Sequence, residues 1–263
     1  MDKSINRSVA WMHMFAAATR PVTDRLTYTT QSGIAAGLKR CGGYGFVPRK
    51  ITDEEKFYLS LDLAGKVVYD IGSYEGIFSL FAARAVGPTG CLVVFEPNPE
   101  SFRRTKRNLE LNHFGCSITL RNFALGGERY TATMTCPGGE PARATLDKNI
   151  AAKFSSNGEA RAEFQVQVEK LDDSIAMGLP IPEFIKIDTE GYEYDVIRGA
   201  ERTLREHGPD LFIEMHGTTP DHWIENRRNV QRMIVNCGYS VYDMYRKLVS
   251  EAEAASHLYC RKS

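Results

Sequence analysis

One stretch constrains the fold most: an apolar run at 67–71 that is followed by two closely spaced glycines, Gly72 and Gly76. The run is short, apolar and rich in β-branched residues, which is typical of a strand buried on both faces of a parallel sheet. Glycine lacks a Cβ, so the backbone here can turn sharply and approach a ligand closely. Beyond the glycines, apolar residues recur at helical spacing, namely Ile77, Leu80, Phe81 and Ala85. We therefore expect a strand, a turn and a helix, with a ligand at the carboxyl end of the strand.

Asp70 discriminates between the ligands that such a turn can hold. The dinucleotide fingerprint needs three glycines, G-x-G-x-x-G, and Asp70 stands at the first of these positions. A carboxylate there would repel a pyrophosphate and attract a positively charged ligand. S-adenosylmethionine (SAM) carries a sulfonium and an ammonium and no phosphate. The pattern resembles the first motif of class I SAM-dependent methyltransferases, which would make Asp70, Gly72, Ser73 and Gly76 cofactor-binding residues. A strand-to-helix turn without a ligand is the alternative.

Composition excludes several classes of protein. The chain has 263 residues, which allows one large α/β domain or two small ones. Lys plus Arg and Asp plus Glu both number 33, so no global basic field exists to hold a nucleic acid. Six scattered cysteines without a C-x-x-C argue against a zinc site or a disulfide framework and predict a cytoplasmic protein. No apolar run is long enough to cross a bilayer, so we expect no stable membrane insertion.

A second acid follows the next apolar strand. The run at 91–95 ends in Glu96, and an acid at that place can accept hydrogen bonds from both ribose hydroxyls of a nucleoside. The alternative is an acid that serves only the helix dipole. Asn98 can cap the following helix and is a further cofactor-binding candidate. After a third strand, the small residues around Ala124 form a loop that can border an adenine ring.

Four ionisable residues follow two later strands. Asp188 and Glu190 end one strand, and Glu214 and His216 end the next. His216 is the expected general base, because the unperturbed pKa of histidine is about 6.5. Glu190 or Glu214 would orient His216 or bind the acceptor, and Asp188 would face the methionine end of the cofactor. The alternatives are that these groups hold a divalent metal, magnesium or manganese rather than zinc, or that they only cap a helix and occupy a loop.

A set of motifs in a fixed order extends this interpretation to most of the chain. The motifs are Val-Val-Tyr-Asp-Ile-Gly at 67–72, Phe-Glu-Pro-Asn-Pro at 95–99, Ala-Leu-Gly at 124–126, Leu-Asp-Asp at 171–173, Ile-Lys-Ile-Asp-Thr-Glu-Gly-Tyr-Glu at 185–193 and Ile-Glu-Met-His at 213–216. Together they resemble the FkbM-type family of SAM-dependent methyltransferases, over roughly residues 55–245. The resemblance implies O-methylation of a hydroxyl on a sugar, glycoconjugate or natural product. A NAD-dependent oxidoreductase and a noncatalytic SAM-binding protein are the alternatives.

Strand and helix alternate, which predicts a doubly wound, mostly parallel seven-stranded sheet of Rossmann-like class I type. We expect an N-terminal extension at 1–54, with an amphipathic helix before about residue 24, that acts as a substrate lid or an oligomer contact. A SAM-dependent methyltransferase domain at 55–263 would follow. Within it, alternating polar and apolar residues predict a β insertion at 128–170. The Gly-, Pro- and Ser-rich part of the insertion, 137–158, is expected to be a loop or lid, with plain disorder as the alternative. The expected partners are a small-molecule or glycan acceptor and a second copy of the chain.

Overall fold

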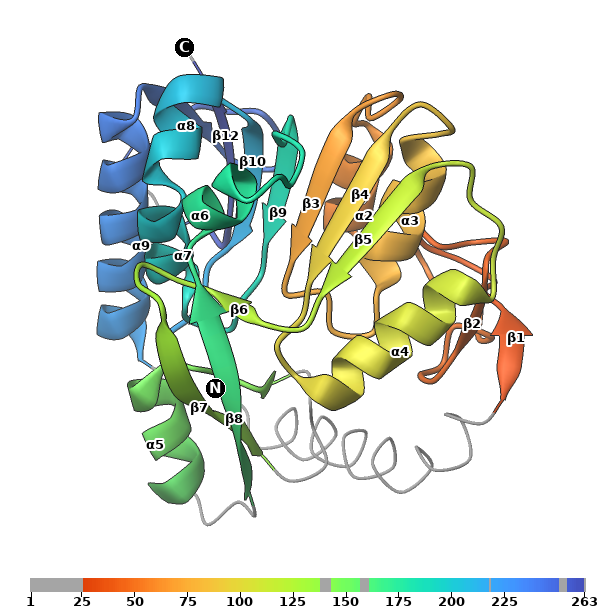
Figure 1. The fold of residues 1–263 in the computed structure, drawn as a ribbon, viewed down its shortest axis with the longest axis horizontal. Coiled ribbons are helices and arrows are strands. Elements are labelled where there is room, and N and C mark those ends of the chain that lie inside the picture. The colour runs from red at the N-terminus through yellow and green to blue at the C-terminus, as the bar shows by residue number, and fades with distance from the viewer. Residues whose placement is uncertain (1–25, 138–142, 157–160, 218, 251–254, 263) are drawn as a thin grey trace.

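The structure, a computed structural model, describes residues 26–137, 143–156, 161–217, 219–250 and 255–262 (Figure 1). The amphipathic helix expected before residue 24 lies outside these ranges. Among the described residues, no helix has the length and apolar character needed to cross a bilayer.

The central sheet has seven strands, most of them parallel. Their spatial order is β11 (Tyr239–Tyr242), β12 (His257–Lys262), β10 (Asp210–Glu214), β9 (Phe184–Ile187), β3 (Val67–Ile71), β4 (Cys91–Phe95) and β5 (Ser117–Arg121). The strands from β10 to β5 pair in parallel, whereas β12 pairs antiparallel with both β10 and β11. This topology confirms the predicted fold class. The carboxyl ends of β3, β4, β9 and β10 therefore lie along one edge of the sheet.

Helices cover both faces of the sheet (Figure 1). One face packs against α2 (Asp53–Leu59) and α3 (Ile77–Ala85), with α4 (Pro99–Glu110) beside α3. The other face packs against α6 (Leu171–Ala176), α7 (Glu193–Gly199), α8 (Glu201–His207) and α9 (Pro220–Asn236). Along β3, Val68 packs in the core on the side of α2 and α3, and Tyr69 packs in the core on the side of α6 to α9. Both side chains are fully buried. Burial on both faces explains why the strands read as continuous apolar runs.

A smaller three-stranded sheet lies next to the central one. Its order is β6 (Ala124–Leu125), β8 (Arg161–Glu169) and β7 (Tyr130–Pro137), and β7 pairs antiparallel with β8 as expected. The expectation of a loop or lid over residues 137–158 is wrong in part, because residues 148–156 form the helix α5 (Lys148–Ser156). Phe154 of α5 is buried, so an apolar contact supports a helix inside a segment whose composition is typical of a loop.

The N-terminal segment contacts α4. Its two short strands, β1 (Thr27–Thr29) and β2 (Lys39–Cys41), pair antiparallel. The backbone N–H of Cys41 donates to Asn108 of α4 at 2.8 Å. The domain boundary expected after residue 54 falls inside α2, which begins with a capping box between Thr52 and Glu55. The helix therefore joins the extension to the central domain without an intervening linker.

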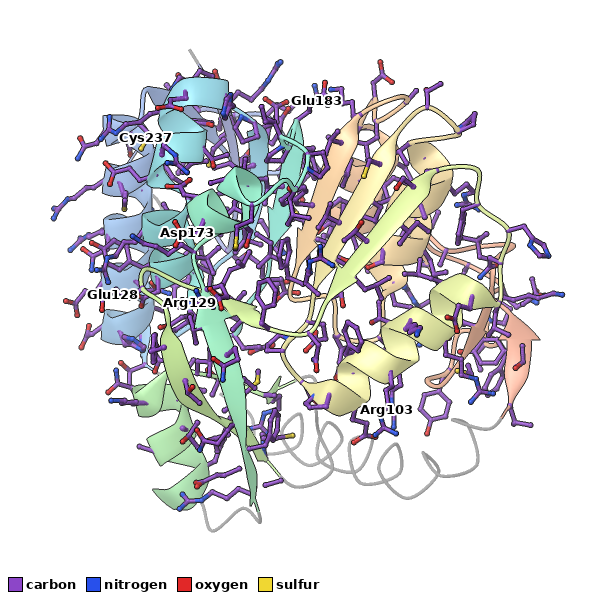
Figure 2. The ribbon with its side chains drawn as sticks, viewed as in Figure 1. Arg103, Glu128, Arg129, Asp173, Glu183 and Cys237 are labelled. Carbon is purple, nitrogen blue, oxygen red and sulfur yellow. The ribbon has the colours of Figure 1, made fainter. Side chains whose placement is uncertain are left out.

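The helix α4 has one exposed basic side and one buried polar side. Arg103, Lys106 and Arg107 are exposed, and Arg103 points away from the sheet (Figure 2). On the opposite side, Thr105 and Asn108 are fully buried. These two buried residues contact the glycine-containing turn that follows β3.

Candidate active site

The turn after β3 is fixed by contacts that only glycine permits. Gly72 has a φ of +80°, and a Cβ added there would lie 1.8 Å from the carbonyl oxygen of Asp188. Lys186 Nζ donates to the carbonyl oxygen of Gly72 at 3.0 Å. Gly76 has a φ of +77° and is the N-cap of α3. The turn is thus held close to the end of β9.

The turn is also held from the α4 side. Thr105 Oγ1 donates to the carbonyl oxygen of Tyr74 at 2.8 Å, and Asn108 Nδ2 donates to that of Glu75 at 2.9 Å. Tyr74 has a φ of +51°, in the left-handed region that non-glycine residues rarely adopt. These bonds support the strained backbone, which is a common property of ligand-binding turns. Ser73 bonds to Thr105 through its hydroxyl at 3.2 Å and lies in the same turn.

Asp70 lies beneath the turn and not beside a cavity. Its side chain is fully buried, accepts a hydrogen bond from Ser79 Oγ, and has its other oxygen 3.7 Å from Lys186 Nζ. Burial raises the pKa of the Asp70 carboxyl, an effect that the charge of Lys186 opposes. From this position Asp70 can orient a cofactor ammonium only through the turn and Lys186, and its expected part in cofactor binding stays a prediction. Asp70 supports Lys186 and the first turn of α3.

Glu96 is buried at the carboxyl end of β4 and faces a cavity. Its carboxylate accepts hydrogen bonds from the backbone N–H of Tyr74 at 2.7 Å and of Asn98 at 2.9 Å. Burial raises the pKa of Glu96 to about 7. Each carboxylate oxygen has room for a second hydrogen bond, so the group can still accept two hydroxyls. Asn98, by contrast, caps α4 through Oδ1 and lines neither of the two cavities described next, so its expected cofactor contact stays a prediction.

Two cavities meet at this edge of the sheet. The first, which we name the Glu96 pocket, holds about 770 Å³ of empty space. Its lining includes Gly72, Phe95, Glu96, Phe123, Ala124 and Asp188. The small sheet and its loop close it with Met134, Ala144 and Leu146. Apolar walls around one buried acid are typical of a pocket for a small organic ligand.

The second cavity, the Glu54 pocket, holds about 740 Å³ of empty space. Its lining includes Arg49, Glu54, Tyr58, Ile77, Lys186 and Glu214. It shares Gly72, Tyr74 and Asp188 with the Glu96 pocket. Arg49 is paired with Glu55 at 2.7 Å. Two ligands bound side by side would therefore meet above Gly72 and Asp188.

His216 lies between four carboxylates, and one of them fixes the orientation of its ring. Glu193, which is fully buried, lies 3.1 Å from His216 Nδ1 and accepts a bond from Asn226 Nδ2 at 2.9 Å. His216 Nε2 then faces the oxygens of Asp188, Glu190 and Glu214 at 3.8, 3.8 and 3.7 Å.

The charges around His216 change its expected role. Burial alone would lower the pKa of His216, but the hydrogen bond and charge of Glu193 raise it to about 10. His216 is therefore protonated near neutral pH in the free protein. In that state it cannot accept a proton, which disagrees with its predicted role as general base.

The neighbouring acids differ in their charge. Burial alone would raise the pKa of Asp188. Lys186 Nζ lies 3.0 Å from Asp188 Oδ2, however, and its positive charge lowers that pKa below the ordinary value. Burial raises the pKa values of Glu190 and Glu214 to about 7 each. Glu190 also has a φ of +52°, so its backbone is strained like that of Tyr74. Asp188, Glu190, Glu214 and His216 were expected to meet at two strand ends, and they do lie together.

Two residues of this site were not among the sequence-based candidates. Glu193 orients His216, a role that we expected of Glu190 or Glu214. Lys186 connects Asp70, Gly72 and Asp188. A lysine between Ile185 and Ile187 in a buried strand is a signal in itself, because a charge is costly there unless it is paired.

The known proteins that this chain is similar to include several methyltransferases. Residues 70–241 match the family described as the methyltransferase FkbM domain. Methyltransferase 1 of Beauveria bassiana (strain ARSEF 2860) is 30% identical over 146 residues, 51% of this chain and 58% of that protein. Methyltransferase sdnD of Sordaria araneosa is 24% identical over 213 residues, 73% of this chain and 79% of that protein. The crystal structure of methyltransferase FkbM from Methylobacillus flagellatus KT has a TM-score of 0.46 and 17% identity, over 76% of this chain and 45% of that one. The chain thus spans about half the length of the Beauveria and Methylobacillus proteins.

Proposed function

The chain belongs to the FkbM methyltransferase family, and we propose on that basis that it transfers a methyl group from SAM to a hydroxyl of a sugar, glycoconjugate or natural product. The observation that carries the proposal is the meeting of the two pockets at Gly72, Tyr74 and Asp188. Such a pair of cavities suits a cofactor on one side and an acceptor on the other. When bound, SAM supplies the methyl group on a positively charged sulfur.

The Glu96 pocket fits the adenosine part of SAM. Glu96 accepts hydrogen bonds from the ribose hydroxyls, and its spare acceptor capacity supports this role. Phe95, Phe123 and Ala124 give the adenine ring an apolar surface. Gly72 and Asp188 both line this pocket, where the methionine part would lie, and the carboxylate of Asp188 balances positive charge. Asp70 and Gly76 contribute by holding the turn.

The Glu54 pocket fits the acceptor. Its cationic residues, Arg49 and Lys186, are paired with Glu55 and Asp188, so an anionic acceptor would find few open partners. Carboxylates can accept hydrogen bonds from neutral hydroxyls, which favours a polyhydroxylated molecule. Asp188 and Glu214 would hold the acceptor oxygen behind the methyl group. Positioning of this kind can supply on the order of 7–11 kcal/mol of the barrier reduction.

A panel assay combined with one substitution tests the proposal. The full chain is incubated with SAM and with sugars, glycosides, polyketides, proteins and RNA, and mass spectrometry identifies any product that has gained a methyl group. Ile77→Trp narrows the Glu54 pocket. We expect this variant to lose methyl transfer at least tenfold while calorimetry gives an unchanged SAM affinity. Methylation of protein or RNA alone, or loss of SAM binding in Ile77→Trp, would contradict the assignment.

A further inference from the structure

We propose that Asp188, Glu214 and His216 form a binding site for one divalent cation, of the Mn²⁺ or Mg²⁺ type, at the edge of the acceptor pocket. One oxygen of each acid and Nε2 of the histidine lie within 4.8 Å of one another. The role of the ion in methyl transfer rests on the proposed function, whereas its binding does not. The ion would act as a Lewis acid that lowers the pKa of a bound acceptor hydroxyl.

The spacing of the three groups suits ligands that share an ion. His216 Nε2 lies 3.8 Å from Asp188 Oδ1 and 3.7 Å from Glu214 Oε1, both too long for a hydrogen bond. Ligands at about 2.1 Å from one octahedral ion are separated by about 3.0 Å when adjacent and about 4.2 Å when opposite. The two separations from His216 Nε2 lie between these values, so binding of an ion requires small shifts of the side chains. An ion placed between the groups would displace the proton from His216 Nε2 to solvent and would bind atoms that are otherwise too far apart to bond directly.

Each of two ligands is oriented by a buried partner. Glu193 lies against His216 Nδ1 at 3.1 Å, which directs Nε2 toward the acids. A carboxylate bonded to the far nitrogen is the usual support of a metal-binding histidine. Lys186 holds Asp188 Oδ2 at 3.0 Å, which leaves Oδ1 directed at His216. These supports come from α7 and β9, so they keep the ligands in place before an ion binds.

A second candidate triad shares Glu214 but has less support. Glu54, Glu214 and His257 also place one ligand atom each within 4.8 Å. His257 Nε2 is 3.9 Å from Glu214, and its Nδ1 is bonded to the hydroxyl of Ser256, which is exposed. No buried carboxylate orients this ring in the described residues. We therefore assign the ion to the first triad, and His257 provides a matched control.

The donor set also selects the ion. Two carboxylates and one imidazole, with Glu190 Oε1 3.8 Å from His216 Nε2, give an oxygen-rich site that opens into a cavity. Such sites suit Mn²⁺ and Mg²⁺, which keep several waters, more than the closed sulfur and nitrogen sites of structural zinc. Open positions would remain for a hydroxyl from the Glu54 pocket.

The test measures Mn²⁺ binding to the full chain in the absence of SAM. Calorimetry gives the number of sites and the affinity, and electron spin echo spectroscopy detects the coupling of Mn²⁺ to an imidazole nitrogen. Asp188→Asn, His216→Gln and Glu193→Gln are compared with His257→Gln. We expect one site in the unaltered protein and a loss of tenfold or more in each of the first three variants. His257→Gln should remain within about twofold, and only His216→Gln and Glu193→Gln should lose the nitrogen coupling.

Circular dichroism is measured on all four variants, and SAM affinity on the three that leave Asp188 intact, to separate loss of the site from loss of the fold. Absence of Mn²⁺ binding to the unaltered protein would overturn the proposal, as would nitrogen coupling that survives in His216→Gln. If Mn²⁺ affinity falls in His257→Gln but not in His216→Gln, the ion binds Glu54, Glu214 and His257 instead, and the proposal is overturned. SAM binding without Mn²⁺ binding would defeat the metal site and leave the proposed function standing.

Discussion

At the scale of single residues, Glu96 predicts how cofactor affinity depends on pH. Its pKa is raised to about 7 by burial, and hydroxyl donors favour its charged form. Affinity for a ribose-containing ligand should therefore fall as the pH drops through 7, because protonation removes an acceptor. Calorimetry with 5′-methylthioadenosine between pH 8.5 and 5.5 measures this, since that ligand has no amino group that titrates in the same range.

Glu96→Gln is the control for that pH series. It should bind about 1.5–3 kcal/mol more weakly at pH 8.5, because the charge-assisted bonds are lost, and its affinity should vary less with pH than that of the unaltered protein. A variant that keeps the pH dependence of the unaltered protein would exclude Glu96 as the titrating group.

The close packing at Gly72 allows a prediction about the free energy of unfolding. Gly72→Ala introduces a Cβ at a φ of +80° and 1.8 Å from a backbone oxygen, whereas Gly87→Ala introduces one at a φ of +65° with nothing within 4 Å. The left-handed backbone alone should cost each variant about 1–2 kcal/mol of unfolding free energy. Gly72→Ala should cost roughly 1–3 kcal/mol more, because the turn must move away from β9. Urea denaturation measures both, and equal losses would mean that the close approach to Asp188 is unimportant.

The sequence predicted individual site residues where a strand end fixed their position. Glu96, Asp188, Glu214 and His216 follow buried strands directly, so the parallel sheet places them at one edge. Glu193 could not be assigned in this way, since its direction depends on how α7 lies against α9 and on the bond from Asn226. For the same reason the pKa of His216 could not be read from the sequence.

At the scale of elements, the small sheet and its loop form a wall of the Glu96 pocket. Thr145 Oγ1 donates to the carbonyl oxygen of Glu190 at 2.7 Å, so the insertion is bonded to the loop after β9. Ala144, beside it, is buried and faces the pocket. Ala144→Phe should therefore fill part of the pocket and weaken SAM binding at least tenfold.

Ala152→Phe is the matched control for this substitution, because Ala152 is exposed on α5 of the same insertion. It should leave SAM affinity unchanged in calorimetry. If Ala144→Phe also binds SAM normally, the cofactor does not occupy the Glu96 pocket.

Elements were predictable where apolar periodicity was strong. The strands expected at 67–71, at 91–95 and before Glu214 were found. The helix α5 was missed, since loop-forming residues surround its few apolar contacts. Apolar residues recur at helical spacing from Val196 to Leu204, but this segment is divided at Ala200, whose φ of −110° and ψ of 4° separate α7 from α8. Such a break depends on packing against neighbouring elements, which the periodicity does not contain.

At the scale of the whole molecule, cofactor binding should stabilise the fold by mass action. SAM at 100 times its Kd should add about 2.7 kcal/mol to the unfolding free energy. For a chain of this size that corresponds to a rise in Tm of roughly 5–10 °C. S-adenosylhomocysteine should act similarly, and NAD at the same concentration should not. A larger shift with NAD than with SAM would support the oxidoreductase alternative.

The position of β12 has a consequence for synthesis of the protein. This strand comes last among the described elements, yet it lies inside the sheet between β10 and β11. A ribosome delivers the chain from its amino end, so both neighbours are made before the strand that joins them. Until residues 257–262 emerge, the nascent chain carries the glycine turn and the acids but exposes unpaired sheet edges, which promote aggregation. A product of premature termination after β11 would thus contain nearly every residue of the site and still depend on chaperones.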